Sequence, residues 1–179
     1  MTDGRATGEL LIVTGPPGAG KSTVATRLAD ARSPSVLVEG DEFFRFLRQG
    51  RIDPWLPASQ RQNEHVTEAA ASSTGRFARD YWTVYDGVLG PWFVPTFLAA
   101  TALPTAHYVV LLPDVERCLR RVATRVGHGF SDAGATRHMH EQFAAPTVAE
   151  RHVLRDPPDD VDVVAEQILE LVDAGTVRL

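Results

Sequence analysis

Two patterns of apolar residues alternate along the chain and divide it into predicted strands and helices. Short apolar runs are typical of buried strands, whereas apolar residues that recur every three or four positions indicate helices with one buried face. The predicted strands cover residues 10–13, 36–38, 81–85, 107–112 and 152–154. The predicted helices cover residues 22–31, 43–47, 60–78, 115–126 and 161–171. Strands that alternate with helices predict an α/β fold in which a parallel sheet carries helices on both faces.

Two of the predicted helices carry signals at their starts. Ser59, followed three residues later by Gln62, forms a candidate capping box for the helix over 60–78. The residues expected on the buried face of this helix are Val66, Ala70, Ser73 and Phe77. The C-terminal helix has two candidate N-cap residues, Asp159 and Asp160.

The turn after the first predicted strand has the full phosphate-binding pattern GxxxxGK[ST]. The residues GPPGAGKS, from Gly15 to Ser22, lie between a predicted strand and a predicted helix, which is the context that the pattern requires. Glycines let backbone amides converge on an anion, and the following helix N-terminus adds the positive end of its dipole. The expected nucleotide-binding residues here are Gly15, Pro16, Pro17, Gly18, Ala19, Gly20, Lys21, Ser22 and Thr23.

Within this loop, two side chains have predicted roles of their own. Lys21 is expected to neutralise the β- and γ-phosphates of ATP, and Ser22 is expected to give a hydroxyl ligand to Mg²⁺. Lys21 is the single lysine of the chain beside 17 arginines, which excludes the guanine-recognition motif NKxD of GTPases.

A predicted strand ends at Asp86, where an aspartate can accept a hydrogen bond from a magnesium-bound water or from Ser22. The alternative is a turn aspartate that precedes Gly87. Glu39 ends another predicted strand, and the sequence leaves open whether Glu39 or Asp86 is the main carboxylate on the magnesium side.

Asp41 follows the second predicted strand by two further residues, in the sequence Glu39-Gly40-Asp41. A carboxylate in this place can face both the γ-phosphate and the hydroxyl of an acceptor. The alternative is that Asp41 caps the short helix that follows it.

Arginines gather on one side of the predicted helix over 115–126. Arg117, Arg121 and Arg125 lie opposite its apolar stripe at 3.6 residues per turn and so share a polar face. For Arg117 and Arg120 a solvated surface position is expected. Arg121 and Arg125 are the candidates for contact with the nucleotide.

Composition and charge narrow the class of protein. The 179 residues, of which 44% are hydrophobic and 23% charged, predict one folded domain over residues 1–179. The net charge of −5 makes nucleic acid an unlikely main partner. The one cysteine, Cys118, cannot form an internal disulfide, and its expected role is packing. No apolar run suits a signal peptide or a membrane span, so we expect a cytoplasmic protein.

The order of these motifs resembles the small-molecule P-loop kinases, a group that includes gluconate and shikimate kinases and chloramphenicol phosphotransferase-like enzymes. The resemblance rests on GPPGAGKS, on strands that end in EGD and YDG, and on the pair Arg121 and Arg125, and it covers most of the chain. It implies a P-loop NTPase three-layer fold with a five-stranded parallel sheet. It also implies that Asp41 binds or deprotonates the acceptor, that the two arginines contact adenine or phosphates, and that a lid over about residues 126–140 closes over ATP.

The chain departs from this group in two places. Glu39 stands where some of these kinases have an aspartate, and YDG leads into VLGPW rather than into the arginine-bearing loop of nucleoside monophosphate kinases. A nucleotide acceptor is therefore less expected. Trp55 and Trp92 follow Asp-Pro and Gly-Pro in loops, where they either line an acceptor pocket or pack in the ordinary way.

The predicted activity is transfer of the γ-phosphate of ATP to a hydroxyl of a small molecule, with Mg²⁺ as cofactor, in a monomer or homodimer. Lys21, Asp41 and Arg125 are the predicted catalytic residues, with Asp41 and Trp92 on the acceptor side. One rival is a P-loop ATPase or nucleotide-dependent switch without an acceptor, and another is a 5′-hydroxyl nucleic-acid kinase. The acceptor itself is left open among sugars, antibiotics and nucleosides.

Overall fold

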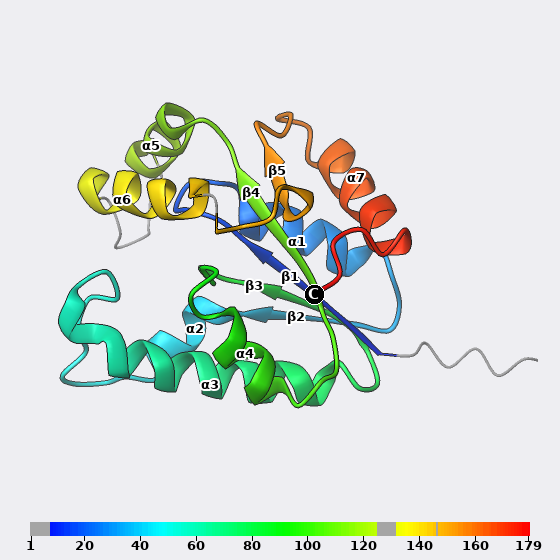
Figure 1. Ribbon diagram of the computed structural model, residues 1–179, viewed down its shortest axis with the longest axis horizontal. Helices are drawn as coiled ribbons and strands as arrows, with labels where there is room; N and C mark the ends of the chain where they lie inside the picture. The colour runs from blue at the N-terminus through cyan, green and yellow to red at the C-terminus, as the bar shows by residue number, and fades with distance from the viewer. Residues whose placement is uncertain (1–7, 125–131, 146) are drawn as a thin grey trace, which may run out of the picture.

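The fold is a five-stranded parallel sheet between layers of helices (Figure 1). The computed structural model describes residues 8–124, 132–145 and 147–179. The strands are β1 (Glu9–Thr14), β2 (Ser35–Glu39), β3 (Trp82–Asp86), β4 (His107–Leu112) and β5 (Val153–Arg155), in the spatial order β2-β3-β1-β4-β5. The α-helices are α1 (Lys21–Asp30), α2 (Gly40–Arg45), α3 (Gln60–Phe77), α4 (Val94–Thr101), α5 (Val115–Thr124), α6 (Ala133–Ala144) and α7 (Val161–Asp173). Two short 3₁₀ helices are η1 (Pro57–Ser59) and η2 (Glu150–His152). This architecture confirms the fold expected from the sequence.

Each face of the sheet has its own hydrophobic core. Because successive side chains of a strand point to opposite faces, Leu10 and Ile12 of β1 pack with the residues of α3 and α4. Leu11 and Val13 of the same strand pack with the residues of α1 and α7. A strand buried on both faces needs an unbroken apolar run, which explains why β1 and β4 were recognisable from the sequence.

The capping box predicted for α3 is wrong. Ser59 already has helical backbone angles, because η1 runs directly into α3, and its side chain makes no capping bond. The Ser59 hydroxyl instead donates to the carbonyl oxygens of Leu56 and Pro54. The Gln62 side chain pairs with the backbone of Ile52 through two hydrogen bonds of 2.7 and 2.8 Å. Both side chains therefore fasten the preceding loop to the helix.

The buried face of α3 agrees with the expected one at Val66 and Ala70 but not at Ser73 and Phe77. Phe77 is 43% exposed, and the buried residues of the helix are Val66, Ala70, Ala71, Thr74 and Gly75. The reason is α4, which the sequence analysis did not predict and which packs against α3. A Cβ atom at Gly75 would lie 2.1 Å from the carbonyl oxygen of Thr101, so the two helices approach at backbone contact there.

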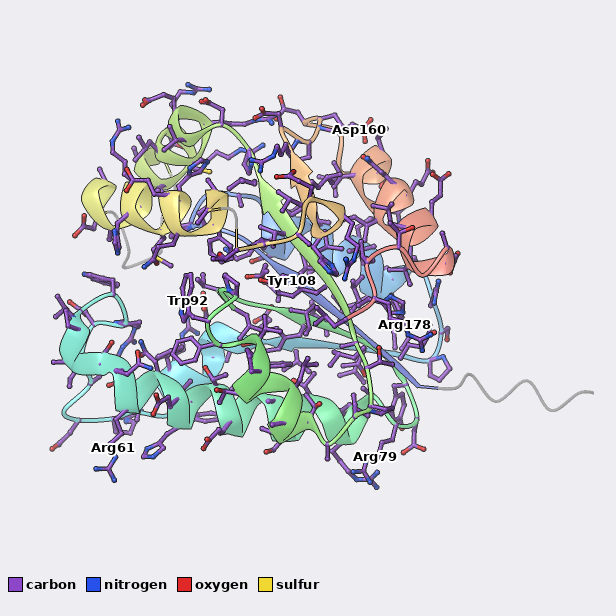
Figure 2. All side chains as sticks on the ribbon, in the orientation of Figure 1. Arg61, Arg79, Trp92, Tyr108, Asp160 and Arg178 are labelled. Atoms are coloured by element: carbon purple, nitrogen blue, oxygen red, sulfur yellow. The ribbon has the colours of Figure 1, made fainter. Side chains whose placement is uncertain are left out.

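One of the two predicted N-cap candidates, Asp160, caps the C-terminal helix α7. Asp160 accepts hydrogen bonds from the backbone N–H groups of Asp162 and Val163, and Figure 2 shows it at the start of α7. Asp159, the other candidate, instead forms ion pairs with Arg117 and Arg121. Among the described residues, no helix is long and apolar enough to cross a membrane.

The contact between α3 and α4 yields a stability prediction. Gly75→Ala places a methyl group against a backbone oxygen that cannot move aside cheaply, so we expect a loss of about 1–3 kcal/mol. For a domain of this size that loss lowers the melting temperature by several degrees. Glu68→Ala, at an exposed position of the same helix, is the control and should change stability by about 0.5 kcal/mol or less. A melting temperature for Gly75→Ala equal to that of the control would contradict the close approach.

Candidate active site

The phosphate-binding loop is held against the ends of β4 and α5 by close backbone contacts. Gly15 has φ 144°, and a Cβ atom there would lie 2.2 Å from the carbonyl oxygen of Leu111. Gly18 has φ 79°, and a Cβ atom there would lie 2.4 Å from the carbonyl oxygen of Cys118. Both positions therefore require glycine. Cys118 is fully buried, and burial raises the pKa of its thiol to about 11, so it packs as a neutral side chain.

The loop leads into the N-terminus of α1. Gly20 occupies the N-cap position, and no side chain caps the first backbone N–H groups of the helix. Such groups, together with the positive end of the helix dipole, form an anion site. Lys21 is the first residue of α1, and its Nζ donates to the carbonyl oxygen of Pro16 at 3.1 Å. The ammonium group thus lies over the same loop. Ser22 and Thr23 follow in the first turn, and both are exposed.

The predicted carboxylates meet at the carboxyl edge of the sheet. Glu39 and Asp86 are paired in the ladder between β2 and β3, and Asp86 is also level with Val13, near the end of β1. Asp86 is 7% exposed, whereas Glu39 is exposed. Asp86 is therefore a strand residue rather than a turn residue. In the described part of the chain, no three His, Cys, Asp or Glu side chains form a group that could hold a metal ion by themselves.

Asp41 lies in the first turn of α2 and is exposed. The alternative that it caps this helix is wrong, since Glu39 occupies the N-cap position and no side chain makes a capping bond there. A carboxylate in the first turn still interacts favourably with the helix dipole. Asp41 is thus exposed on the same edge of the sheet as the phosphate-binding loop.

The side chain of Tyr85, to which the sequence analysis assigned no role, is buried and reaches this edge. Its ring packs edge-on against Phe97 at 4.7 Å, and its hydroxyl lies where a Cβ atom at Gly40 would approach to 2.2 Å and one at Gly87 to 2.9 Å. Burial, and then the charges of Asp41 and Asp86, raise the pKa of Tyr85 above its ordinary value, so the phenol stays neutral. No hydrogen bond joins its hydroxyl to another described residue. A signal was available in the sequence, because YDG ends a strand.

Of the α5 arginines expected in solvent, Arg120 is found there and Arg117 is not. Arg121 places Nη1 3.4 Å from the carbonyl oxygens of Gly18 and Ala19, so it lies beside the phosphate-binding loop, and its contact with a nucleotide stays a prediction. Arg120 is exposed, as expected. Arg117 was expected in solvent, but its side chain is only 20% exposed because Asp159 and the loop before α7 cover it.

Part of the predicted lid lies outside the described residues. In this region the residues not described are 125–131, which comprise Arg125 and the first part of the lid. The predicted place of Arg125 therefore stays a prediction. From residue 133 onward the predicted lid forms the start of α6. Asp132 is the N-cap of this helix, and its side chain accepts a hydrogen bond from the backbone N–H of Ala135. Ala135 and Thr136 are buried. This half of the predicted lid is therefore a packed helix.

Trp92 belongs to the loop after β3, and its side chain lies next to α6, as Figure 2 shows. It is 44% exposed, and its ring centre is 5.9 Å from that of Phe143 on α6. The loop that carries it is fixed at Leu89, whose N–H donates to the Thr14 hydroxyl at 2.8 Å and whose carbonyl oxygen accepts from the Tyr108 hydroxyl at 2.9 Å. Thr14 directly precedes the phosphate-binding loop. Its hydrogen bond to Leu89 therefore fixes the position of the loop after β3 relative to the phosphate-binding loop.

A pocket of about 420 Å³ opens between α2 and α3. Its lining is mostly apolar and includes no Asp, Glu, Lys or Arg: Phe43, Phe46, Leu47, Gly50, Ile52, Gln62, His65, Val66 and Ala69. Gln62 is engaged by the Ile52 backbone, and His65 is the other polar side chain in the lining. Trp55 does not line this pocket and is half-buried in the loop before α3.

Comparison with known proteins agrees with this geometry. The adenylate kinase of Sphingopyxis alaskensis is 26% identical in an alignment that covers 89% of this chain and 79% of that protein. The tunicamycin resistance protein of Deinococcus radiodurans superposes with a TM-score of 0.70 at 17% identity, over 92% of this chain and 95% of its own. The shikimate kinase of Acinetobacter baumannii, solved with shikimate, superposes with a TM-score of 0.67 at 19% identity, over 96% of each chain. At these identities the structural likeness establishes the fold.

A family model described as an AAA domain matches residues 10–149. The match takes in the phosphate-binding loop, the strand ends at Glu39 and Asp86, and the whole of α5 and α6. It thus covers the elements that surround the candidate site. The chain therefore belongs to this AAA-domain family of P-loop proteins and has the P-loop NTPase kinase fold.

Proposed function

We propose that the protein transfers the γ-phosphate of ATP to a hydroxyl of a small molecule. The observation that carries this proposal is the juxtaposition, at one edge of the sheet, of a phosphate cradle and the exposed carboxylate of Asp41. A cradle alone would suit any P-loop nucleotidase, whereas a phosphotransferase also needs a group that orients the acceptor. The adenylate kinase and shikimate kinase named above, which are kinases of small molecules, support the same reading.

The residues of the loop fit the phosphates of ATP. Gly15 and Gly18 let the loop backbone lie directly against the carbonyl oxygens of Leu111 and Cys118, which fixes the shape of the loop. The N–H groups at the start of α1, which no side chain caps, provide donors for phosphate oxygens. Lys21, now on the Pro16 carbonyl, would exchange that partner for the β- and γ-phosphates. Magnesium prefers oxygen ligands and keeps several waters, which suits the Ser22 hydroxyl and, through water, Asp86. When bound, the ion neutralises charge on the phosphates.

In the proposed reaction the acceptor oxygen forms a bond to the γ-phosphorus while the bond from that phosphorus to the β,γ-bridging oxygen breaks. Asp41 takes the proton of the acceptor hydroxyl, and ADP leaves with the electron pair of the broken bond. Lys21 and the arginines Arg121 and Arg125 stabilise the negative charge that the transferring group carries. Positioning and electrostatics thus account for the catalysis.

The pocket between α2 and α3 indicates what kind of acceptor to test first. Phe43 and Phe46 in its lining come two and five residues after Asp41, so one short segment carries both the pocket wall and the proposed base. The lining has no arginine or lysine to bind a carboxylate or phosphate. We therefore expect an acceptor with an uncharged and partly apolar body. A sugar acid or a nucleotide fits this lining less well.

An acceptor screen tests the proposed function. ADP release from Mg-ATP is measured alone and with neutral apolar alcohols, hydroxylated antibiotics, sugars, sugar acids, nucleosides and a 5′-hydroxyl oligonucleotide. Release that depends on a small hydroxyl compound supports the proposal. Release at full rate without any acceptor supports an ATPase or switch, and release that only the oligonucleotide stimulates supports a nucleic-acid kinase.

Lys21→Ala should abolish phosphoryl transfer and leave the fold intact. The substitution removes the one ammonium group at the loop, together with a part-buried hydrogen bond that contributes about 0.5–1.5 kcal/mol. ADP formation and thermal melting are measured together. Arg27→Ala, at an exposed position of the same helix, is the control and should keep wild-type turnover. Normal turnover in Lys21→Ala would contradict the P-loop mechanism.

Asp41→Asn should lower kcat by about 10²–10⁴-fold, because asparagine keeps the size of the side chain but cannot take a proton. The affinity for ATP should hardly change, since Asp41 faces the acceptor. Steady-state kinetics with the acceptor found in the screen gives both values. Glu42→Gln removes the neighbouring carboxylate, which pairs with Arg45, and should leave kcat close to wild type. Equal activities in the two variants would rule out Asp41 as the base.

Tyr85→Phe should raise the KM for the acceptor by about 3–10-fold, if a hydrogen bond of about 1 kcal/mol is lost to the bound acceptor. The melting temperature should stay the same, because the hydroxyl makes no hydrogen bond to the described residues. Tyr108→Phe is the matched control, since its hydroxyl donates to the Leu89 carbonyl and its loss should lower the melting temperature. A drop in stability with unchanged KM for Tyr85→Phe would assign it a structural role.

A further inference from the structure

One carboxylate joins two arginines of α5 beside the phosphate-binding loop. The Oδ1 atom of Asp159 accepts hydrogen bonds from Nη2 of Arg117 and, at 3.0 Å, from Nη2 of Arg121. The other terminal nitrogen of Arg121 lies 3.4 Å from the carbonyl oxygens of Gly18 and Ala19. Each terminal nitrogen of the Arg121 guanidinium thus has an acceptor, one on the phosphate-binding loop and one on the loop before α7.

The loop that carries Asp159 is itself fixed at several points. The Asp156 side chain accepts a hydrogen bond of 2.6 Å from the backbone N–H of Asp114, at the end of β4. Arg117 donates through Nη1 to the carbonyl oxygen of Pro157 at 2.6 Å, and Asp160 caps α7. Asp159 therefore acts from a rigid support rather than from a free loop.

The contribution of these ion pairs to global stability is expected to be small. The Asp159 side chain is 80% exposed and that of Arg121 is 39% exposed. Exposed pairs of this kind contribute about 0–1 kcal/mol to folding. An arginine side chain, however, has about 2 kcal/mol of rotamer entropy, so a partner that selects one orientation can matter for whatever the arginine binds.

We propose that Asp159 is a positioning residue that holds Arg121 in place for the phosphates of the bound nucleotide. The inference rests on the proposed nucleotide-binding role of Arg121. Two arginines and one carboxylate leave a net positive charge beside the loop, so the carboxylate orders the arginines without cancelling their attraction for an anion. The loop between β5 and α7 thereby takes part in nucleotide binding through a side chain that need not touch the nucleotide.

The sign of the effect separates this proposal from plain electrostatics. Removal of a carboxylate near bound phosphates should by itself tighten the binding of an anion, because the local charge becomes more positive. If Asp159 works by positioning, its removal should instead weaken binding. The two explanations thus predict opposite changes in the Kd for the nucleotide.

Calorimetric titration with ADP tests the proposal without any knowledge of the acceptor. Asp159→Ala should raise the Kd for ADP by about 3–10-fold, and Arg121→Ala should raise it at least as much. The double variant should bind no more weakly than Arg121→Ala, because the carboxylate acts through that arginine. Asp162→Ala removes an exposed aspartate that pairs with Arg27 in the first turn of α7, and it should bind ADP like the wild type.

Several outcomes overturn the inference. An unchanged or lower Kd in Asp159→Ala, or losses that multiply in the double variant, would show that Asp159 does not act through Arg121. A lower melting temperature with an unchanged Kd would show a structural role alone. If the wild-type protein fails to bind ADP, the proposed function fails as well. If it binds ADP and Asp159→Ala binds equally, only the role of Asp159 is lost.

Discussion

The backbone contact between the phosphate-binding loop and the elements beneath it is the constraint on which the rest of the site depends. Gly15 and Gly18 bring the loop within reach of carbonyl oxygens at the end of β4 and in α5, where no side chain would fit. No side chain caps the first N–H groups of α1, an arrangement that suits an anion. The contact also makes α5 the neighbour of the loop, and Arg121 of that helix lies 3.4 Å from the carbonyl oxygens of Gly18 and Ala19.

The parallel arrangement of the strands supplies the second half of the site. In a parallel sheet all strands end at one edge, so residues that are far apart in the chain meet there. In this way Glu39 and Asp86 become neighbours in the ladder between β2 and β3. Asp41 is the second residue of α2, which follows β2 directly. The hydroxyl of Tyr85 reaches the same edge, held by the packing of its ring on Phe97.

Hydrogen bonds of side chains connect these parts. Thr14, the last residue before the phosphate-binding loop, and Tyr108 both bind Leu89, so the loop that bears Trp92 cannot shift independently of β1 and β4. On the other side, Arg117 and Arg121 tie α5 to the loop before α7 through Asp159. Polar contacts thus fix the loop after β3 on one side of the site and α5 on the other. Apolar packing holds the sheet and helix layers together.

The amino-acid sequence by itself determined the elements whose signals are local. These are the apolar runs of β1 and β4, the pattern from Gly15 to Ser22, and the carboxylates at the ends of β2 and β3. They were readable because hydrophobic period, turn chemistry and the helix dipole act over a few residues. Tertiary structure alone decided the places of α4, Ser59, Arg117 and Tyr85. Arg117 and Asp159 are 42 residues apart, and Arg121 and Gly18 are 103 apart. Such contacts form only when the sheet brings distant segments together, and no spacing along the chain encodes them.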